Sequence, residues 1–324
     1  MPIRGRNKHQ PGYTGEMDDS DVIKAELQTV GDAVRWAQTC FEQAELYFGH
    51  GTDNAWDEAL HLVLGSLQLD IESDPSVLDC ELSGAEKALL LRNVQLRVEE
   101  RIPVPYLTGR AWFASLEFKI DRRAIIPRSP IAELIEREFQ PWYSGPGLSR
   151  VLDLCCGSGC IGLAVAAWQP QTRVDLADID ESALALAEEN RELLGLEERV
   201  NIVRSDLFTE LRGRQYDLIV TNPPYVDDDD LTSMPAEYGF EPSLALGSGR
   251  DGLDAVRRIL ADAVHFLSPD GLLIGEVGNS WMALQDAFPG VPFTWIELER
   301  GGHGVFVLTG KELAEHGASL QKPL

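Results

Sequence analysis

From Asp32 onward, the apolar residues of the chain recur at the spacing of one helix face. The residues that share this face are Val34, Cys40, Phe41, Ala44 and Phe48. Gly49 and Gly51 follow and would end this first helix. Residues 1–21, by contrast, are polar and contain Gly, Pro, Asn and Asp without periodicity. We therefore expect a flexible tail ahead of the first helix.

Two more helices are predicted before the first marked change of pattern. One spans 53–64, and the other begins after Ser83, where Glu86 completes a capping box. The apolar positions of this third helix are Leu89, Leu90, Val94, Leu96 and Val98. Pro103 then stops the helix. Residues 22–104 are thus predicted to form a small helical domain.

Residues 105–149 are expected to form a β-hairpin linker, because their apolar residues suggest two short strands. These residues are Phe113, Leu116, Phe118, Ile120, Ile125 and Ile126. From residue 150 to 324, strand and helix patterns alternate, which predicts a parallel sheet with helices on both faces. The predicted strands are 150–155, 173–179, 200–206, 216–221 and 271–277, and the helices are 159–168, 181–195 and 251–267. A final hairpin, 294–300 and 304–310, makes the last strand antiparallel.

The charge of the chain restricts its partners. With 28 Lys and Arg against 53 Asp and Glu, the net charge is −25. A negative surface repels phosphate, so we expect neither direct nucleic-acid binding nor attachment to an anionic membrane. A basic protein or a small molecule is a better partner, although the excess acid can also serve solubility alone.

The termini and cysteines indicate a compartment. Residues 1–15 have no apolar core, so we read no secretory signal there, and no apolar run is long enough to span a bilayer. The cysteines are Cys40, Cys80, Cys155, Cys156 and Cys160, an odd number with three crowded together. This spacing suits neither a disulfide framework nor a paired zinc site, so we expect reduced thiols, no metal and a cytoplasmic protein.

A glycine-rich loop follows the first strand of the alternating region. Gly157-Ser-Gly-Cys-Ile-Gly162 matches the dinucleotide fingerprint G-x-G-x-x-G, and Asp178 ends the second strand at the distance expected for a ribose contact. The loop fits a nicotinamide cofactor as well as S-adenosylmethionine, and it can also be a turn without a ligand. Asp153 favours S-adenosylmethionine, because a carboxylate there would repel a pyrophosphate and attract a cation. Alternatively, the Asp153 carboxylate could cap a neighbouring backbone amide.

Two further strand ends carry candidate residues. Asp206, after the third strand, can accept from an adenine amino group with Leu207 on the ring, or it can cap a helix. Asn222-Pro-Pro-Tyr225 follows the fourth strand, and its prolines offer no N–H. The Asn222 side-chain oxygen and the Pro223 carbonyl can therefore accept both hydrogens of a planar –NH₂ group, while the tyrosine stacks beside it. The alternative is a rigid turn.

These motifs together resemble the glutamine-specific, S-adenosylmethionine-dependent protein methyltransferases. The resemblance rests on the loop that begins at Asp153 and on the Asn-Pro-Pro-Tyr tetrapeptide, and it extends over about residues 30–310. The family implies an α/β fold: a seven-stranded Rossmann-like methyltransferase domain, an N-terminal helical domain that recognises substrate, and a β-hairpin linker. Pro127-Arg-Ser-Pro-Ile131 and Glu299-Arg-Gly-Gly-His-Gly-Val-Phe306 look more like the branch that modifies the third large-subunit ribosomal protein than the release-factor branch.

The resemblance also assigns residues to roles. Catalysis would fall to Asn222, Pro223 and Tyr225. The cofactor, S-adenosylmethionine, would be bound by Asp153, Cys155, Gly157, Ser158, Gly159, Asp178, Ile179, Asp206, Leu207 and Asn222. Weaker candidates for substrate binding are Pro224, Phe113 and Arg128.

Several other functions remain open on the sequence. The substrate could be the Gly-Gly-Gln loop of a release factor rather than a basic ribosomal protein. An adenine-amino methyltransferase would use a similar tetrapeptide, but it needs a basic groove that a charge of −25 opposes. A nicotinamide-dependent oxidoreductase and a non-catalytic binding module are the alternatives from other classes.

Overall fold

The computed structural model describes residues 26–143, 145 and 147–321, and the tail expected at 1–21 lies outside them. The described chain forms two compact units. The first comprises the residues up to Leu46 together with Ala55–Glu100, and the second comprises Tyr47–Asn54 together with Arg101 onward. Among the described helices, none is long and apolar enough to cross a membrane.

The first unit is helical. Its elements are α2 (Val30–Gln43), α3 (Ala55–Ser66), the 3₁₀ turn η1 (Pro75–Asp79) and α4 (Gly84–Glu99). The capping box of Ser83 and Glu86 is confirmed, and Thr29 with Asp32 forms another at the start of α2. Two expected positions were wrong, because Phe48 lies beyond the end of α2 and Leu89 is exposed.

The buried face of α4 instead contains Arg97, whose guanidinium lies 2.7 Å from the Glu58 carboxylate of α3. Both side chains are almost completely buried. A charged residue paired with a counter-ion can therefore occupy a core position that apolar spacing alone would not predict.

The residues between the first unit and the large sheet belong to the second unit. The elements here are α5 (Val104–Thr108), β1 (Arg110–Phe113), β2 (Leu116–Lys119) and α6 (Ile131–Glu136). The predicted hairpin is confirmed as the antiparallel pair β1–β2. Ile120, Ile125 and Ile126 lie outside it, and α6 was not expected from the sequence pattern.

The seven-stranded sheet of the second unit confirms the predicted fold class. Its strands are β3 (Arg150–Leu154), β4 (Arg173–Asp178), β5 (Val200–Arg204), β6 (Tyr216–Thr221), β7 (Leu267–Glu276), β8 (Thr294–Trp295) and β9 (Val305–Thr309). Their order is β5-β4-β3-β6-β7-β9-β8, and β9 runs antiparallel to both of its neighbours. The prediction over 294–300 was too long, since β8 pairs over only two residues.

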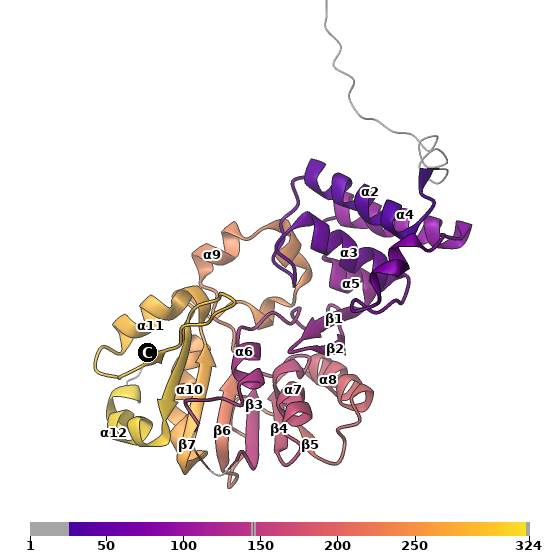
Figure 1. Cartoon of the computed structure of the whole chain (residues 1–324). Helices are drawn as coiled ribbons and strands as arrows, with labels where there is room; N and C mark the ends of the chain where they lie inside the picture. Colours follow the sequence, from indigo (N-terminus) through magenta and orange to yellow (C-terminus); the bar gives the residue numbers. More distant parts are fainter. Residues whose placement is uncertain (1–25, 144, 146, 322–324) are drawn as a thin grey trace, which may run out of the picture. The chain divides into compact units, whose positions relative to one another are not determined.

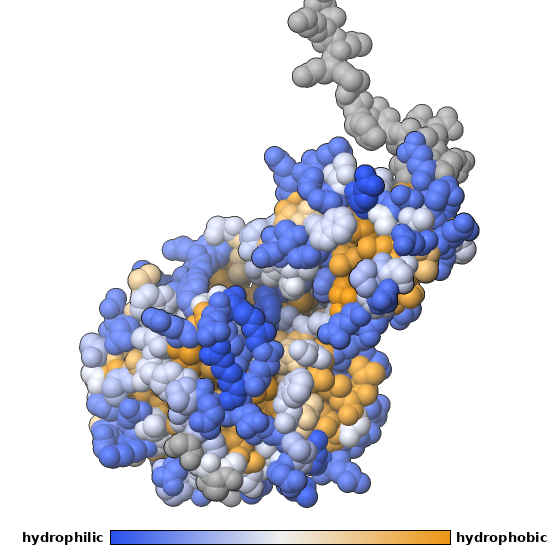
Figure 2. Space-filling view, viewed as in Figure 1, coloured by the Kyte–Doolittle hydropathy of each residue, from blue (hydrophilic) through white to orange (hydrophobic). Residues whose placement is uncertain are grey.

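Helices cover both faces of this sheet (Figure 1). They are α7 (Cys160–Trp168), α8 (Glu181–Leu193), α10 (Asp254–Asp262), α11 (Trp281–Ala287) and α12 (Gly310–Leu320), and a short α9 (Asp228–Ser233) follows β6. Alternation along β3 divides the core: Val151 packs with α6, α7 and α8, whereas Leu152 and Leu154 pack with α10, α11 and α12. Figure 2 shows hydrophilic side chains gathered over α6 on the visible face.

The strand order reverses at β3, which has β4 on one side and β6 on the other. In parallel α/β sheets, loops diverge at such a reversal and leave a crevice at the carboxyl ends of the strands. The loops after β3, β4, β5 and β6 all begin at this edge. The topology therefore brings together the glycine-rich loop and the tetrapeptide, which are more than 60 residues apart in sequence.

Candidate functional site

The loop after β3 turns its backbone toward the carboxyl edge of the sheet. Cys155, Gly157 and Gly159 adopt φ angles of 60°, 54° and 78°, a left-handed region that favours glycine. The Thr221 hydroxyl donates to the Leu154 carbonyl at 2.7 Å and ties the loop to the end of β6. Gly159 packs so closely that a Cβ there would lie within 3.2 Å of three apolar side chains.

Asp153 lies inside β3 and is fully buried. One of its carboxylate oxygens accepts the N–H of Gly162 at 2.7 Å. Burial raises the pKa of Asp153 to about 7, the hydrogen bond from Gly162 opposes this, and the charge of Asp178 adds to it. The carboxylate stands behind the cavity wall and not on it. This is the capping arrangement that the sequence left open as the alternative to a cofactor contact.

Asp178, at the end of β4, does line the cavity. Its two oxygens accept the N–H groups of Gly157 at 2.9 Å and Asp180 at 3.0 Å. Burial raises the pKa of Asp178, and these backbone hydrogen bonds partly offset the effect. Each carboxylate oxygen has a second lone pair available, so both can still accept from ligand hydroxyl groups. Ile179 beside it is 46% exposed and lines the same cavity.

Asp206 and Leu207 follow β5 and also line this cavity. The Asp206 carboxylate accepts from the guanidinium of Arg258 at 2.9 Å. Arg258 comes from α10, and nothing in the sequence pattern around it predicted this contact. In the described chain β5 and β6 are joined without a helix, so the alternative of a helix cap at Asp206 does not apply.

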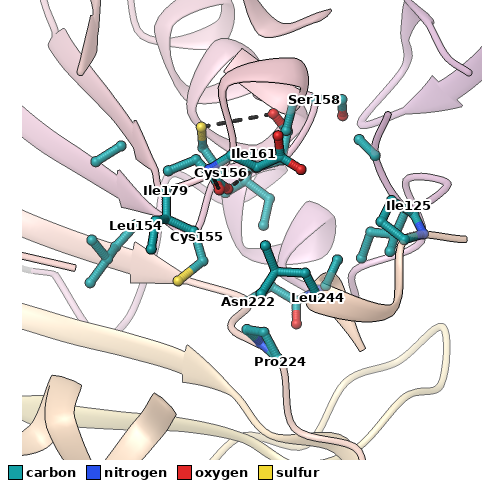
Figure 3. A pocket seen from close by; sticks show the side chains of 18 of the residues that line it. Ile125, Leu154, Cys155, Cys156, Ser158, Ile161, Ile179, Asn222, Pro224 and Leu244 are labelled. Atoms are coloured by element: carbon teal, nitrogen blue, oxygen red, sulfur yellow. Dashed lines mark hydrogen bonds between the residues drawn. The ribbon is translucent and has the colours of Figure 1, made fainter. Parts of the chain in front are cut away.

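These loops enclose a first cavity of about 220 Å³. Figure 3 shows Cys156, Ser158 and Ile161 on one side of it and Asn222, Pro224 and Leu244 on the opposite side. Most of its wall is apolar, and carboxylates are contributed by Asp178, Asp180 and Asp206. The cavity can therefore hold a flat apolar group together with hydroxyl and amino groups.

A second cavity of about 260 Å³ adjoins the first. Asn222 lines both, as do Ile125, Arg128 and Ala245. Pro223 and Tyr225 line only the second cavity, whereas Pro224 lines only the first. The Asn222 carboxamide makes no hydrogen bond to another described residue, so its oxygen and nitrogen remain available to a ligand at the junction.

Tyr225 is held by a buried polar chain. Its hydroxyl donates to one oxygen of Glu276 at 3.0 Å, and Ser129 donates to the other oxygen at 2.5 Å. Burial raises the pKa of both Tyr225 and Glu276. The tyrosine ring also fits tightly over Gly278, where a Cβ would lie 2.6 Å from the ring. The ring orientation is therefore set by its surroundings.

The two weaker candidates from the linker have different positions. Arg128 lines both cavities, but its guanidinium forms a bidentate pair with Glu241 at 2.5 and 2.7 Å. Glu241 also accepts the N–H of Ile126 at 3.0 Å, so the pair fixes the linker on this unit. Phe113 is buried and does not reach the second cavity; it lines a third cavity nearby.

The three crowded cysteines lie around the first cavity as free thiols. Burial raises the pKa of Cys155 and Cys156, and it raises that of Cys160 to about 12. The thiols therefore stay protonated at neutral pH and pack as small apolar groups. Within the described chain no three or more His, Cys, Asp or Glu side chains gather as a metal site would require.

Sequence reasoning did not assign roles to Arg258, Glu276 and Ser129. Glu276 lies in a Glu-Val-Gly-Asn segment that formed part of the family resemblance, which was a usable signal. Ser129 stands where the linker departs from the release-factor pattern. Arg258 offers no signal, because a surface arginine on a helix is ordinary until its partner is known.

Comparisons with known proteins place the chain among methyltransferases. The family model described as "Methyltransferase small domain" matches residues 144–238. A protein of Xanthomonas campestris named "Ribosomal protein uL3 glutamine methyltransferase" is 51% identical over 91% of this chain and 96% of its own length. A protein of Francisella tularensis with the same name is 44% identical over 95% of this chain and 98% of its own length.

Among solved structures, the catalytic domain of hMettl16 in complex with an RNA hairpin aligns with a TM-score of 0.47 and 18% identity. The alignment covers 70% of this chain and 81% of that one. The near-complete matches to the two named relatives show the family, since both exceed 40% identity over almost the whole chain. The chain belongs to the family of ribosomal protein uL3 glutamine methyltransferases.

Proposed function

We propose that this protein transfers a methyl group from S-adenosylmethionine to the side-chain amide nitrogen of a glutamine in ribosomal protein uL3. The observation that carries the proposal is the position of Asn222, which lines the first and second cavities at their junction. A methyl donor in one cavity and an amide in the other would meet beside this residue. The names of the two relatives support uL3 as the substrate.

The first cavity contains hydrogen-bond acceptors and apolar faces that would suit S-adenosylmethionine. Asp178 retains acceptor positions for ribose hydroxyls, Asp206 can accept from the adenine amino group, and Leu207 and Ile179 offer apolar faces to the base. The half-buried Cys155 and Gly157 line the same cavity beside them. When bound, S-adenosylmethionine supplies a methyl group already activated by a positively charged sulfur.

The tetrapeptide supplies the positioning that an amide nitrogen needs. An amide is a weak nucleophile, because its lone pair is delocalised into the carbonyl. The Asn222 side-chain oxygen and the Pro223 carbonyl would hold its two N–H bonds and fix the direction of the nitrogen, with Tyr225 as a wall. Orientation of this kind can lower a barrier by about 7–11 kcal/mol.

The proposal extends to the partner and its compartment. The substrate is a basic ribosomal protein, which a chain of charge −25 would attract, and the enzyme makes no direct contact with nucleic acid. The site of action is the cytoplasm, where the thiols found here stay reduced. A release-factor substrate is the alternative within the same chemistry, and the names of the relatives favour uL3 over it.

A labelled-methyl assay tests this function and the role of Asn222 together. Purified uL3, a release factor and DNA compete as acceptors, and label is expected in a glutamine of uL3. Asn222→Ala is expected to lower kcat by about 10³-fold while the Kd for S-adenosylmethionine, measured by calorimetry, changes less than about threefold.

The control is Asn201→Ala on β5, which lines neither cavity and loses one hydrogen bond to Asp175. It should leave kcat within about twofold of the parent enzyme. Label in the release factor or DNA instead of uL3 would refute the proposed substrate. Full activity of Asn222→Ala would refute the role given to the tetrapeptide.

A further inference from the structure

The loop of residues 299–303, here called the 299–303 loop, is fastened to α6. The buried carboxylate of Glu133 accepts the backbone N–H groups of Glu299 and Arg300, each at 3.1 Å. The hydrogen bond from Glu299 is the largest cause that lowers the pKa of Glu133, so the carboxylate is charged at neutral pH. Glu133 and the loop are more than 160 residues apart in sequence.

Further contacts hold the same loop against both ends of α6, at Pro130 and at Arg137. Arg137 bridges Glu299 at 2.7 Å and Glu133 at 3.3 Å. Gly302 has a φ of +91°, and a Cβ there would lie 2.8 Å from Cβ of Pro130. Gly301 has a nearly identical φ of +90°, but a Cβ there would meet nothing within 4 Å. The loop therefore contacts the linker closely at Gly302 in particular.

The 299–303 loop lies between the second and third cavities. Gly302 and His303 line the second cavity, which contains Asn222 and Tyr225. Gly301 and Gly302 line the third cavity, of about 460 Å³. Arg128, Pro130 and Gly302 line both, so the second and third cavities share a wall along the loop. The other walls of the third cavity are mostly apolar: Trp112, Phe113, Ala114, Pro127 and Ala132.

The charged side chains of the third cavity already have partners. Glu133 bonds the loop backbone, Arg300 pairs with Glu136, and Arg128 pairs with Glu241. Its remaining binding capacity is therefore the apolar surface around Trp112 and Phe113. A glutamine whose side chain enters the second cavity leaves its backbone at the mouth. Substrate residues one to three positions from that glutamine then lie within about 11 Å of the mouth, because three extended residues span about that distance.

We propose that the second and third cavities form one groove for the substrate polypeptide, with the 299–303 loop as its wall and Glu133 as the residue that positions the loop. The inference rests on the proposed function, because it takes the second cavity as the glutamine site. The occupant of the third cavity is an apolar side chain of the uL3 segment next to the target glutamine. Glu133 touches no reacting atom and acts only through the loop.

The first test compares Glu133→Gln with Glu138→Gln, with purified uL3 as substrate. Each variant removes one negative charge in or just after α6. Only Glu133 accepts the backbone N–H groups of the loop, whereas the exposed Glu138 lines none of the three cavities. For Glu133→Gln we expect about a tenfold rise in KM for uL3, with kcat and the Kd for S-adenosylmethionine within about twofold. Hydrogen exchange at residues 299–303 should quicken. Glu138→Gln should leave KM within about twofold of the parent value.

The second test compares Gly302→Ala with Gly301→Ala. Both substitutions place a side chain at the same left-handed φ, so they share the backbone strain, and only Gly302→Ala also collides with Pro130. The rise in KM for uL3 is expected to be at least about fivefold larger for Gly302→Ala. Equal KM values for the two glycine variants would overturn the inference. Faster hydrogen exchange at residues 299–303 in Glu133→Gln with an unaltered KM for uL3 would also overturn the inference. Parallel losses of kcat and of affinity for S-adenosylmethionine in Glu133→Gln would overturn it as well. If the parent enzyme does not methylate uL3, the proposed function fails instead.

Discussion

Asp153 is a fully buried carboxylate that accepts a hydrogen bond from a backbone amide of the neighbouring helix. Its position at a strand end beside a glycine-rich loop suggested that it faces a cation. In the structure, the alternation of β3 directs it toward α7, where it accepts the N–H of Gly162. The other carboxylate oxygen is buried and has no hydrogen-bond partner among the described residues. The charged form is therefore costly, and the pKa is raised to about 7 from an ordinary value of 3.8.

This raised pKa makes a pH-dependent contribution to stability. Between pH 3.8 and about 7, the folded protein keeps a proton on Asp153 that the unfolded chain has lost. The contribution of Asp153 to the free energy of unfolding is therefore fully present below pH 3.8 and is lost as pH rises through 7. Asp153→Asn removes the titration and keeps an oxygen that can accept from Gly162.

Thermal unfolding without cofactor tests this at two pH values. The Tm of Asp153→Asn minus that of the parent protein should be more positive at about pH 8 than at about pH 5, by roughly 3 °C or more. Taking the difference cancels the titration of the other groups. An equal difference at both pH values would show that Asp153 does not titrate in this range.

Among the elements, α7 depends on one small residue. Gly162 lies in the first turns of α7, and a Cβ there would come within 2.4 Å of the Leu176 side chain and 2.8 Å of Cβ of Asp153. The helix can therefore lie close to β3 and β4 only because this position has no side chain. The same close approach holds the start of α7 beside the loop that lines the first cavity.

Two helical glycines allow a matched prediction. Gly162→Ala should destabilise the protein by about 1–3 kcal/mol through overpacking and weaken S-adenosylmethionine binding, because α7 must move. Gly317→Ala in α12 has open space around its Cβ and should stabilise by about 0.5–1 kcal/mol. Chemical denaturation and calorimetry measure the two effects. Similar stability changes in both variants would contradict the close packing inferred at Gly162.

For the whole molecule, the charge of −25 first served only to exclude partners. The proposed substrate gives it a positive use, because ribosomal proteins are basic before RNA covers them. An acidic enzyme attracts the free protein and is repelled by an assembled ribosome. This long-range attraction belongs to the summed charge and not to any single residue.

Salt dependence measures that attraction. The kcat/KM for uL3 should fall about tenfold between roughly 20 and 200 mM salt, since screening shortens the range of the field. The Kd for S-adenosylmethionine, which is bound by local contacts, should change less than about twofold. A flat salt profile for uL3 would leave the charge with a role in solubility alone.

Much of the fold followed from local pattern. The alternation of strands and helices, the capping box at Ser83 and the terminal hairpin depend on residues close together in sequence, and each is present. The sequence also placed Asn222 and Asp178 correctly at the same sheet edge, because parallel strands end together. The sequence predictions were wrong where packing decides which face of a helix is buried, as at Leu89, or where a strand ends, as in β8.

The sequence by itself therefore determined the fold class and the edge of the sheet where the glycine-rich loop and the tetrapeptide meet. The tertiary structure alone decided which side chains reach the cavities. It placed Asp153 behind the wall, paired Arg258 with Asp206, and joined Glu133 to the 299–303 loop. The physical reason is that burial and hydrogen-bond pairing depend on distant segments, and a local pattern contains no information about the partner that folding brings into contact.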